Sequence, residues 1–200
     1  MIMDHSMFKE FRKELRLFDS KIDFQWTELI FKLPQPLSNI AKACRDVEDS
    51  IIGIKSAISA GVYPPLDYFR KMYSSVYAII RYIVGIANEK FEDRERRKVL
   101  DEYAEILKKM EEVEFEINKI YHSKKDPELI LPHLSIFSDF VDGQIKPLFA
   151  MAIKNMNEEL INKFANEILY QSGIRKRPEE EEEDEDKRIF EDIEEEGEEE

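Results

Sequence analysis

The sequence predicts an all-α protein: a bundle of five or six long helices with short loops, followed by a disordered acidic C-terminal tail. Apolar residues recur every three to four positions through most of residues 4–172, which is the spacing of one helical stripe. Proline and glycine gather at the breaks between these stretches. No pair of alternating stretches is joined by an Asn-Gly type hairpin turn. Antiparallel-leaning helices packed as a bundle are therefore expected.

The first three helices are expected over residues 4–33, 37–60 and 66–91. The segments "LPQP" and "VYPP" separate them, because a proline disfavours helical backbone for the residue before it. Gly61 follows the second helix directly, in the position where helices often end on a left-handed glycine. Each of these proline or glycine breaks falls where the apolar stripe stops, so both signals predict the same helix boundaries.

The remaining helices are expected over residues 93–122, 127–142 and 146–172. The first of these carries apolar residues close to a heptad seam. The second is expected to be interrupted or kinked at Pro132. We expect "DGQIKP" to turn the chain into the last helix, which Gly173 closes.

The charge divides the chain into a bundle domain of residues 1–173 and a disordered acidic tail of residues 174–200. The whole chain has a formal net charge of −14, yet residues 178–200 alone contain 16 acidic residues and only two basic ones. The preceding 177 residues therefore contain 28 acidic and 28 basic residues and are formally neutral. Like charges repel and the tail lacks a core pattern, so we expect disorder there.

A short apolar island, "RIFEDI", interrupts the acidic tail. Ile189, Phe190 and Ile193 would share one helical face, at positions i, i+1 and i+4. Alone, this island is too short to form a stable helix, but it is suited to a groove on another protein. We expect these three residues to be partner-binding.

Composition predicts a soluble, cytoplasmic protein. The single cysteine, Cys44, excludes an intrachain disulfide framework and fits a reducing compartment. The most apolar stretch, residues 76–87, contains Arg81 and is shorter than the roughly 20 residues that span a membrane. No secretory signal pattern opens the chain. Abundant charge, 24 isoleucines and only four glutamines predict a thermophilic source, archaeal or an archaeal virus.

Two pairs of acidic residues are candidates for metal-dependent chemistry. Glu111 with Glu114, and Asp139 with Asp142, are each spaced i, i+3, so that on helices their carboxylates could share a divalent cation. This arrangement resembles the paired acidic motifs of all-α nucleoside-triphosphate pyrophosphohydrolases, although Asp139 stands where those have glutamate. The resemblance implies Mg²⁺-dependent hydrolysis of a nucleotide. The alternative is that these are surface acids, with Glu114, inside an apolar arc, held in a structural ion pair.

Asp46 and Asp49 form a similar pair on the polar side of their helix, where a solvated face explains them equally well. His5, His122 and His133 are scattered, with none of the spacings of a zinc or di-iron site, and no glycine-rich phosphate loop occurs. We therefore expect no metal site and no cofactor.

Two basic segments are candidates for a local positive patch that contacts nucleic acid. The alternative for the first segment is pairing with neighbouring acids along its helix. The residues are Arg94, Arg96, Arg97, Lys98, Arg175, Lys176 and Arg177.

The sequence favours a non-enzymatic interaction or scaffold protein whose acidic arm engages a basic partner protein or masks a basic surface. A pyrophosphohydrolase-like enzyme and an accessory nucleic-acid-binding protein autoinhibited by its tail remain the alternatives. A homo-oligomer through the long helical faces is a further expectation.

Overall fold

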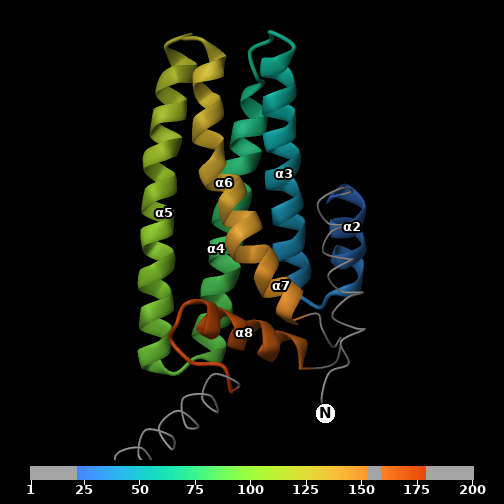
Figure 1. Cartoon of the computed structure of the whole chain (residues 1–200), viewed down its shortest axis with the longest axis vertical. Helices are drawn as coiled ribbons and strands as arrows, with labels where there is room; N and C mark the ends of the chain where they lie inside the picture. Colours follow the sequence, from blue (N-terminus) through green and yellow to red (C-terminus); the bar gives the residue numbers. More distant parts are fainter. Residues whose placement is uncertain (1–21, 153–158, 179–200) are drawn as a thin grey trace, which may run out of the picture.

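The computed structural model describes residues 22–152 and 159–178, and all regular secondary structure in these ranges is helical, which confirms the predicted all-α fold (Figure 1). The elements are α2 (Ile22–Lys32), α3 (Leu37–Ser59), α4 (Leu66–Lys90), α5 (Asp93–His122), the 3₁₀-helix η1 (Pro127–Leu134), α6 (Ser135–Asp139), the π-helix η2 (Phe140–Ile145), α7 (Lys146–Ala152) and α8 (Leu160–Gln171).

The bundle consists of α3, α4, α5 and the continuous helical segment of residues 127–152, which alternate in direction (Figure 1). Short connections of residues 60–65, 91–92 and 123–126 join them, as expected for antiparallel neighbours. Helix α2 lies along the outside of α3, and α8 lies across the end of the bundle where α7 finishes and α5 begins (Figure 1). Within the described ranges, no helix is both long and apolar enough to cross a membrane.

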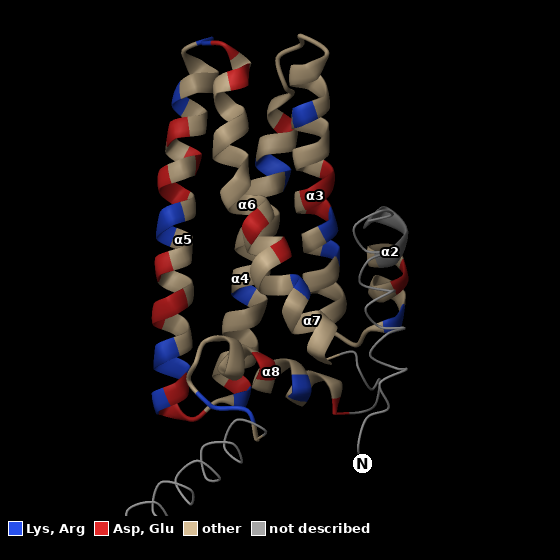
Figure 2. Ribbon diagram, viewed as in Figure 1, with Lys and Arg blue, Asp and Glu red and all other residues tan. Residues whose placement is uncertain are grey.

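The apolar stripes read from the sequence form one core. Its largest fully buried side chains come from every long helix and include Trp26, Ile54, Ile83, Ile117 and Phe137. Charged residues of both signs are instead spread along the length of α5, at the edge of the bundle (Figure 2). Burial of a stripe from each helix against its neighbours stabilises the arrangement, because apolar area is removed from water.

The expected turn at "DGQIKP" is wrong: these residues continue the helical segment instead. Residues 140–145 form the π-helix η2, in which the amide of Lys146 donates to the carbonyl of Val141. Pro147 has no amide hydrogen to donate to the preceding turn, and widening the helix to a π turn accommodates this loss. Gln171 of α8 then donates from Nε2 to the carbonyl oxygen of Gln144, over 3.1 Å. Tertiary contacts thus keep helical a segment whose local chemistry suggests a turn.

Tyr63 links two loops at the end of the bundle where α3 and α5 finish. The hydroxyl group of Tyr63, in the α3–α4 connection, lies 3.2, 3.4 and 3.2 Å from the carbonyl oxygens of Ile120, Tyr121 and Lys125. Lys124 adopts a left-handed backbone with φ 53° and places its ammonium over the rings of Tyr63 and Tyr121, at 5.1 and 5.0 Å. The last carbonyls of α5 therefore meet a donor from another part of the chain.

Candidate functional site

The basic triplet before the acidic tail is attached to the bundle. We call residues 174–178 the arm root and residues 179–200 the arm. The guanidinium of Arg175 binds both carboxylate oxygens of Glu95 on α5, with 2.9 Å between Nη2 and Oε2. Arg177 forms a second bidentate pair with Glu167 of α8, at 2.7 and 3.2 Å, and lies over the ring of Tyr170. Paired guanidinium–carboxylate hydrogen bonds fix orientation as well as distance. The arm root is therefore held against the bundle beside α8 and the start of α5.

The two predicted basic segments do lie together, since Arg175 reaches Glu95 inside the first segment. Acidic residues lie in the same place, however. Arg96 pairs with Asp93, as expected if the first basic segment pairs with neighbouring acids along its helix. Arg94, Arg97 and Lys98 are exposed, and none of them forms an ion pair with another residue of the described ranges. Their spacing of i, i+3 and i+4 places them on one face of α5. The expected patch is thus reduced to these three exposed cations.

The predicted apolar anchors of the arm, Ile189, Phe190 and Ile193, lie outside the described residues.

A buried charged cluster joins α2, α3 and the segment of residues 140–152. Trp26 Nε1 donates to Oε2 of Glu48 over 2.6 Å, and Nζ of Lys146 lies 2.7 Å from Oε1 of the same carboxylate. Lys146, the first residue of α7, also binds Asp142 of η2, four positions earlier, which is its second acidic partner. The side chains of Glu48 and Lys146 are only 10% and 13% exposed. Oε2 of the buried carboxylate therefore accepts a hydrogen bond, whereas Oε1 has the ammonium of Lys146 beside it as an ion pair without a well-aligned hydrogen bond.

Burial and charge oppose each other in this cluster. Burial raises the pKa of Glu48, and the hydrogen bonds from Lys146 and Trp26 offset only part of that shift. Burial alone would lower the pKa of Lys146, but hydrogen bonds to Asp142 and Glu48 outweigh it and the net shift is upward. Cys44 lies in the same region, and burial raises the pKa of its thiol well above its usual value. Cys44 is therefore a buried thiol and not an activated nucleophile.

Sequence reasoning missed this cluster. Glu48 occupies the apolar arc of α3 between Cys44 and Ile51, which is the signal that singled out Glu114 on α5. Its partner Lys146 follows a segment that the sequence assigned to a turn, so no pattern along the chain could place the two together.

The four acids of the pyrophosphohydrolase resemblance have separate surroundings. Glu114 accepts a 2.8 Å hydrogen bond from the hydroxyl of Tyr77, and the ion pair expected for it does not occur among the described residues. Asp142 pairs with Lys146 at the edge of the buried cluster and is itself 56% exposed, and Glu111 and Asp139 are also exposed. Within residues 22–152 and 159–178, no group of three or more His, Cys, Asp or Glu side chains is arranged to hold a metal ion.

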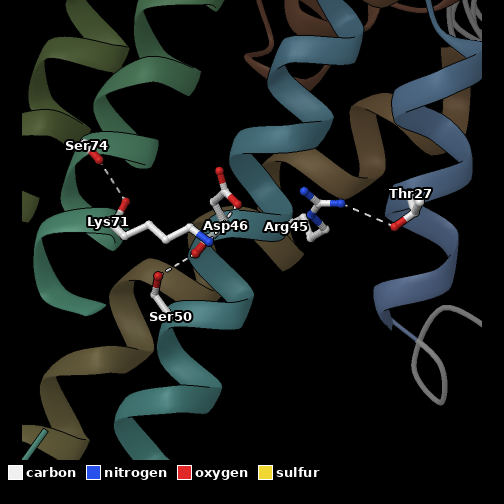
Figure 3. A network of polar contacts seen from close by, with 6 residues as sticks. All are labelled: Thr27, Arg45, Asp46, Ser50, Lys71 and Ser74. Carbon is white, nitrogen blue, oxygen red and sulfur yellow. Dashed lines mark hydrogen bonds and ion pairs between the residues drawn. The ribbon is translucent and has the colours of Figure 1, made fainter. Parts of the chain in front are cut away.

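Asp46, the other candidate acid of an i, i+3 pair, forms an ion pair with a lysine of the bundle. Oδ1 of Asp46 lies 3.0 Å from Nζ of Lys71, an ion pair that links α3 to α4 (Figure 3). Around it, Ser50 donates to the backbone carbonyl of Asp46, and Arg45 reaches the hydroxyl of Thr27 on α2 over 3.4 Å (Figure 3). This network crosses three helices on a half-buried face and is explained by packing alone.

Comparison of the chain with protein-family models, with curated proteins and with solved structures gives no match.

Proposed function

We propose that this chain is a non-enzymatic interaction protein: a rigid helical bundle that presents an acidic arm to a basic partner protein. The observation that carries the proposal is the separation of charge, since a formally neutral body precedes a segment with a net charge of −14. Such a segment attracts a basic surface over a distance set by ionic strength and raises the association rate.

The attachment of the arm supports this proposal. Arg175 and Arg177 are occupied by Glu95 and Glu167, so these two cations of the basic triplet are already neutralised by the body. The acids of the arm are therefore not needed to balance them. In the arm, Ile189, Phe190 and Ile193 would supply apolar contacts that fix the register of the complex.

The test is capture of partners by the full chain and by a variant lacking residues 179–200. We expect the deletion to abolish capture of basic proteins while the thermal unfolding of the bundle is unchanged, because the deletion retains Arg175 and Arg177 and their ion pairs with the bundle. The double variant Phe190→Ala, Ile193→Ala keeps the charge and should weaken capture about tenfold or more, by removing two apolar anchors. An identical set of captured proteins before and after both changes would refute the proposal.

A second candidate has a specific observation in its favour. Arg94, Arg97 and Lys98 are exposed on α5 close to the arm root, so the arm could cover them and keep polyanions away. In that case the same deletion should increase the affinity for a single-stranded DNA probe, with a steep dependence on salt. Unchanged or weaker DNA binding after the deletion would exclude this masking role.

A further inference from the structure

The face of α3 that packs against α2 is covered over only part of its length. Its side chains follow one another at helical spacing and form what we call the α2-facing row: Ala41, Arg45, Glu48, Ile52, Lys55 and Ser59. Ala41 is fully buried and Glu48 is 9% exposed, whereas the next member, Ile52, is 51% exposed. Lys55 and Ser59 are exposed as well. The cover of the row therefore ends within one helical turn of Glu48.

Two contacts fix how α2 lies on this row. Trp26 donates to Glu48 over 2.6 Å, and Arg45 reaches the hydroxyl of Thr27 over 3.4 Å. The later residue of α2 thus meets the earlier residue of α3, and the two helices run antiparallel. Figure 1 shows α2 beside the half of α3 that is nearer the start of α3. Chain that precedes α2 therefore leads toward the other half, where the row is uncovered.

The register gives the positions that face the uncovered residues. Both helices advance by about 1.5 Å per residue, so facing positions in an antiparallel pair keep a nearly constant sum. The position opposite Ile52 is then about residue 21 or 22, and the position opposite Ser59 is about residue 14 or 15. The described part of α2 begins at Ile22, so the cover ends where that part begins.

The sequence before α2 continues its apolar stripe. Phe18, Leu15 and Phe11 stand 8, 11 and 15 positions before Trp26, which is the three-to-four spacing of one helical face. Trp26 and Leu29 belong to the same stripe, and both are buried against the bundle. The stripe thus extends an interface that α2 already makes.

The uncovered positions suit large apolar side chains. Ile52 is itself apolar, Ser59 is small, and Lys55 can lay its aliphatic stem along an apolar neighbour while its ammonium stays in water. Toward α4, the ring of Tyr68 lies against Gly53, the residue next to Ile52, and Tyr68 is 38% exposed. Apolar surface therefore continues beside the row.

We propose that residues 11–21 of this chain bind the uncovered part of the α2-facing row, in the register that α2 sets. The segment is joined directly to α2, so its effective concentration at the row is on the order of millimolar, above that of a separate molecule. The chain thereby closes this face of its own bundle and withdraws Ile52 from other proteins. This inference does not depend on the proposed role of the arm.

The first test is disulfide formation within the full chain. The pair Leu15→Cys with Ser59→Cys should cross-link at least about tenfold faster than Lys13→Cys with Ser59→Cys, because residue 13 lies on the opposite side of a helix from residue 15. The two pairs close loops of nearly equal length, so an unbound segment would cross-link them at similar rates. Cys44 is buried and is present in both variants. Non-reducing electrophoresis separates disulfides within one chain from those between chains.

The second test is the labelling rate of a single thiol introduced into the row. Ser59→Cys should react with a thiol reagent at least about tenfold more slowly than Ser74→Cys, an exposed serine of α4. Adding Phe18→Ser should speed labelling of Ser59→Cys about fivefold or more, because it removes an apolar contact. Leu17→Ser, which lies off the stripe, is the control and should leave the rate unchanged.

Equal cross-linking of the two pairs, or labelling of Ser59→Cys as fast as that of Ser74→Cys, would overturn this inference. Disulfides formed mainly between two chains would assign the row to a second copy and overturn it as well. Deletion of residues 179–200 should leave both measurements unchanged. The capture experiment on the arm uses neither the row nor residues 11–21, so each proposal can fail while the other stands.

Discussion

The indole of Trp26 donates a 2.6 Å hydrogen bond to the carboxylate of Glu48, 22 positions further along the chain. Because Lys146 binds the other oxygen of that carboxylate, one buried side chain connects α2, α3 and α7. A buried charge with matched donors adds little net stability, but removing one donor leaves the charge uncompensated. This asymmetry makes the cluster sensitive to single substitutions.

Trp26→Phe should lower the free energy of unfolding by about 1–3 kcal/mol, because Glu48 loses a donor in a buried setting. The phenyl ring retains much of the edge contact that the Trp26 ring makes with Phe149, at a centroid separation of 5.8 Å. Urea unfolding at pH 7 measures the effect. Phe31→Leu on the same helix is the control, and since Phe31 is 84% exposed it should change stability by no more than about 0.5 kcal/mol. Equal effects of the two changes would contradict a role for the hydrogen bond.

Lys146→Met should lower the free energy of unfolding by about 3–5 kcal/mol, because Glu48 loses its cation in a nearly closed site and must hold an uncompensated charge or take up a proton. Adding Glu48→Gln should recover part of the loss, so that the double variant is more stable than additivity predicts, by about 0.5–3 kcal/mol. Lys119→Met is the control: its pair with Glu116 is 58% and 48% exposed and is worth less than about 1 kcal/mol. Strict additivity in the Glu48 and Lys146 cycle would show that the two side chains are not coupled.

The upward shift of the Glu48 pKa gives stability a specific pH dependence. In the folded protein Glu48 holds its proton to higher pH than its ordinary value of 4.5, so its contribution is fully present below pH 4.5 and is lost as pH rises through the shifted pKa. The wild type should therefore lose stability relative to Glu48→Gln above pH 4.5, by at most about 1.4 kcal/mol per pH unit. The free energies of unfolding of both proteins, measured from pH 4 to pH 7, give this difference. The contribution of the arm's many carboxylates is the same in both proteins and drops out of it.

A difference that moves in the opposite direction would show that Lys146 lowers the Glu48 pKa below its unfolded value. Glu112→Gln, at an exposed position, should show no such pH-dependent difference from the wild type.

Sequence periodicity predicted the long helices well, because their stripes and proline breaks act locally. The helical structure of residues 140–146 was not predictable in this way. It depends on the widened π turn of η2 and on a hydrogen bond that Gln171 of α8 donates to its backbone. For the same reason the Glu48 cluster was missed, since its members come from residues far apart in sequence. Glu114 shows the middle case. Its place in an apolar arc led us to expect an ion pair, which does not occur among the described residues; Glu114 accepts instead from the neutral hydroxyl of Tyr77, which local pattern could not show.

The contact of Tyr63 with the end of α5 has a consequence for the order of folding. Its hydroxyl lies 57–62 positions from the carbonyls it meets, so we expect the last turn of α5 to gain its full stability only once the α3–α4 connection is in place. Tyr63→Phe should therefore speed amide hydrogen exchange near residues 123–126 more than elsewhere, and lower stability by about 1 kcal/mol. Tyr82→Phe, on a half-buried face of α4, serves as the comparison. We therefore expect the end of the bundle that holds Tyr63 to open as one cooperative unit, whose opening depends on the contacts of a single phenol.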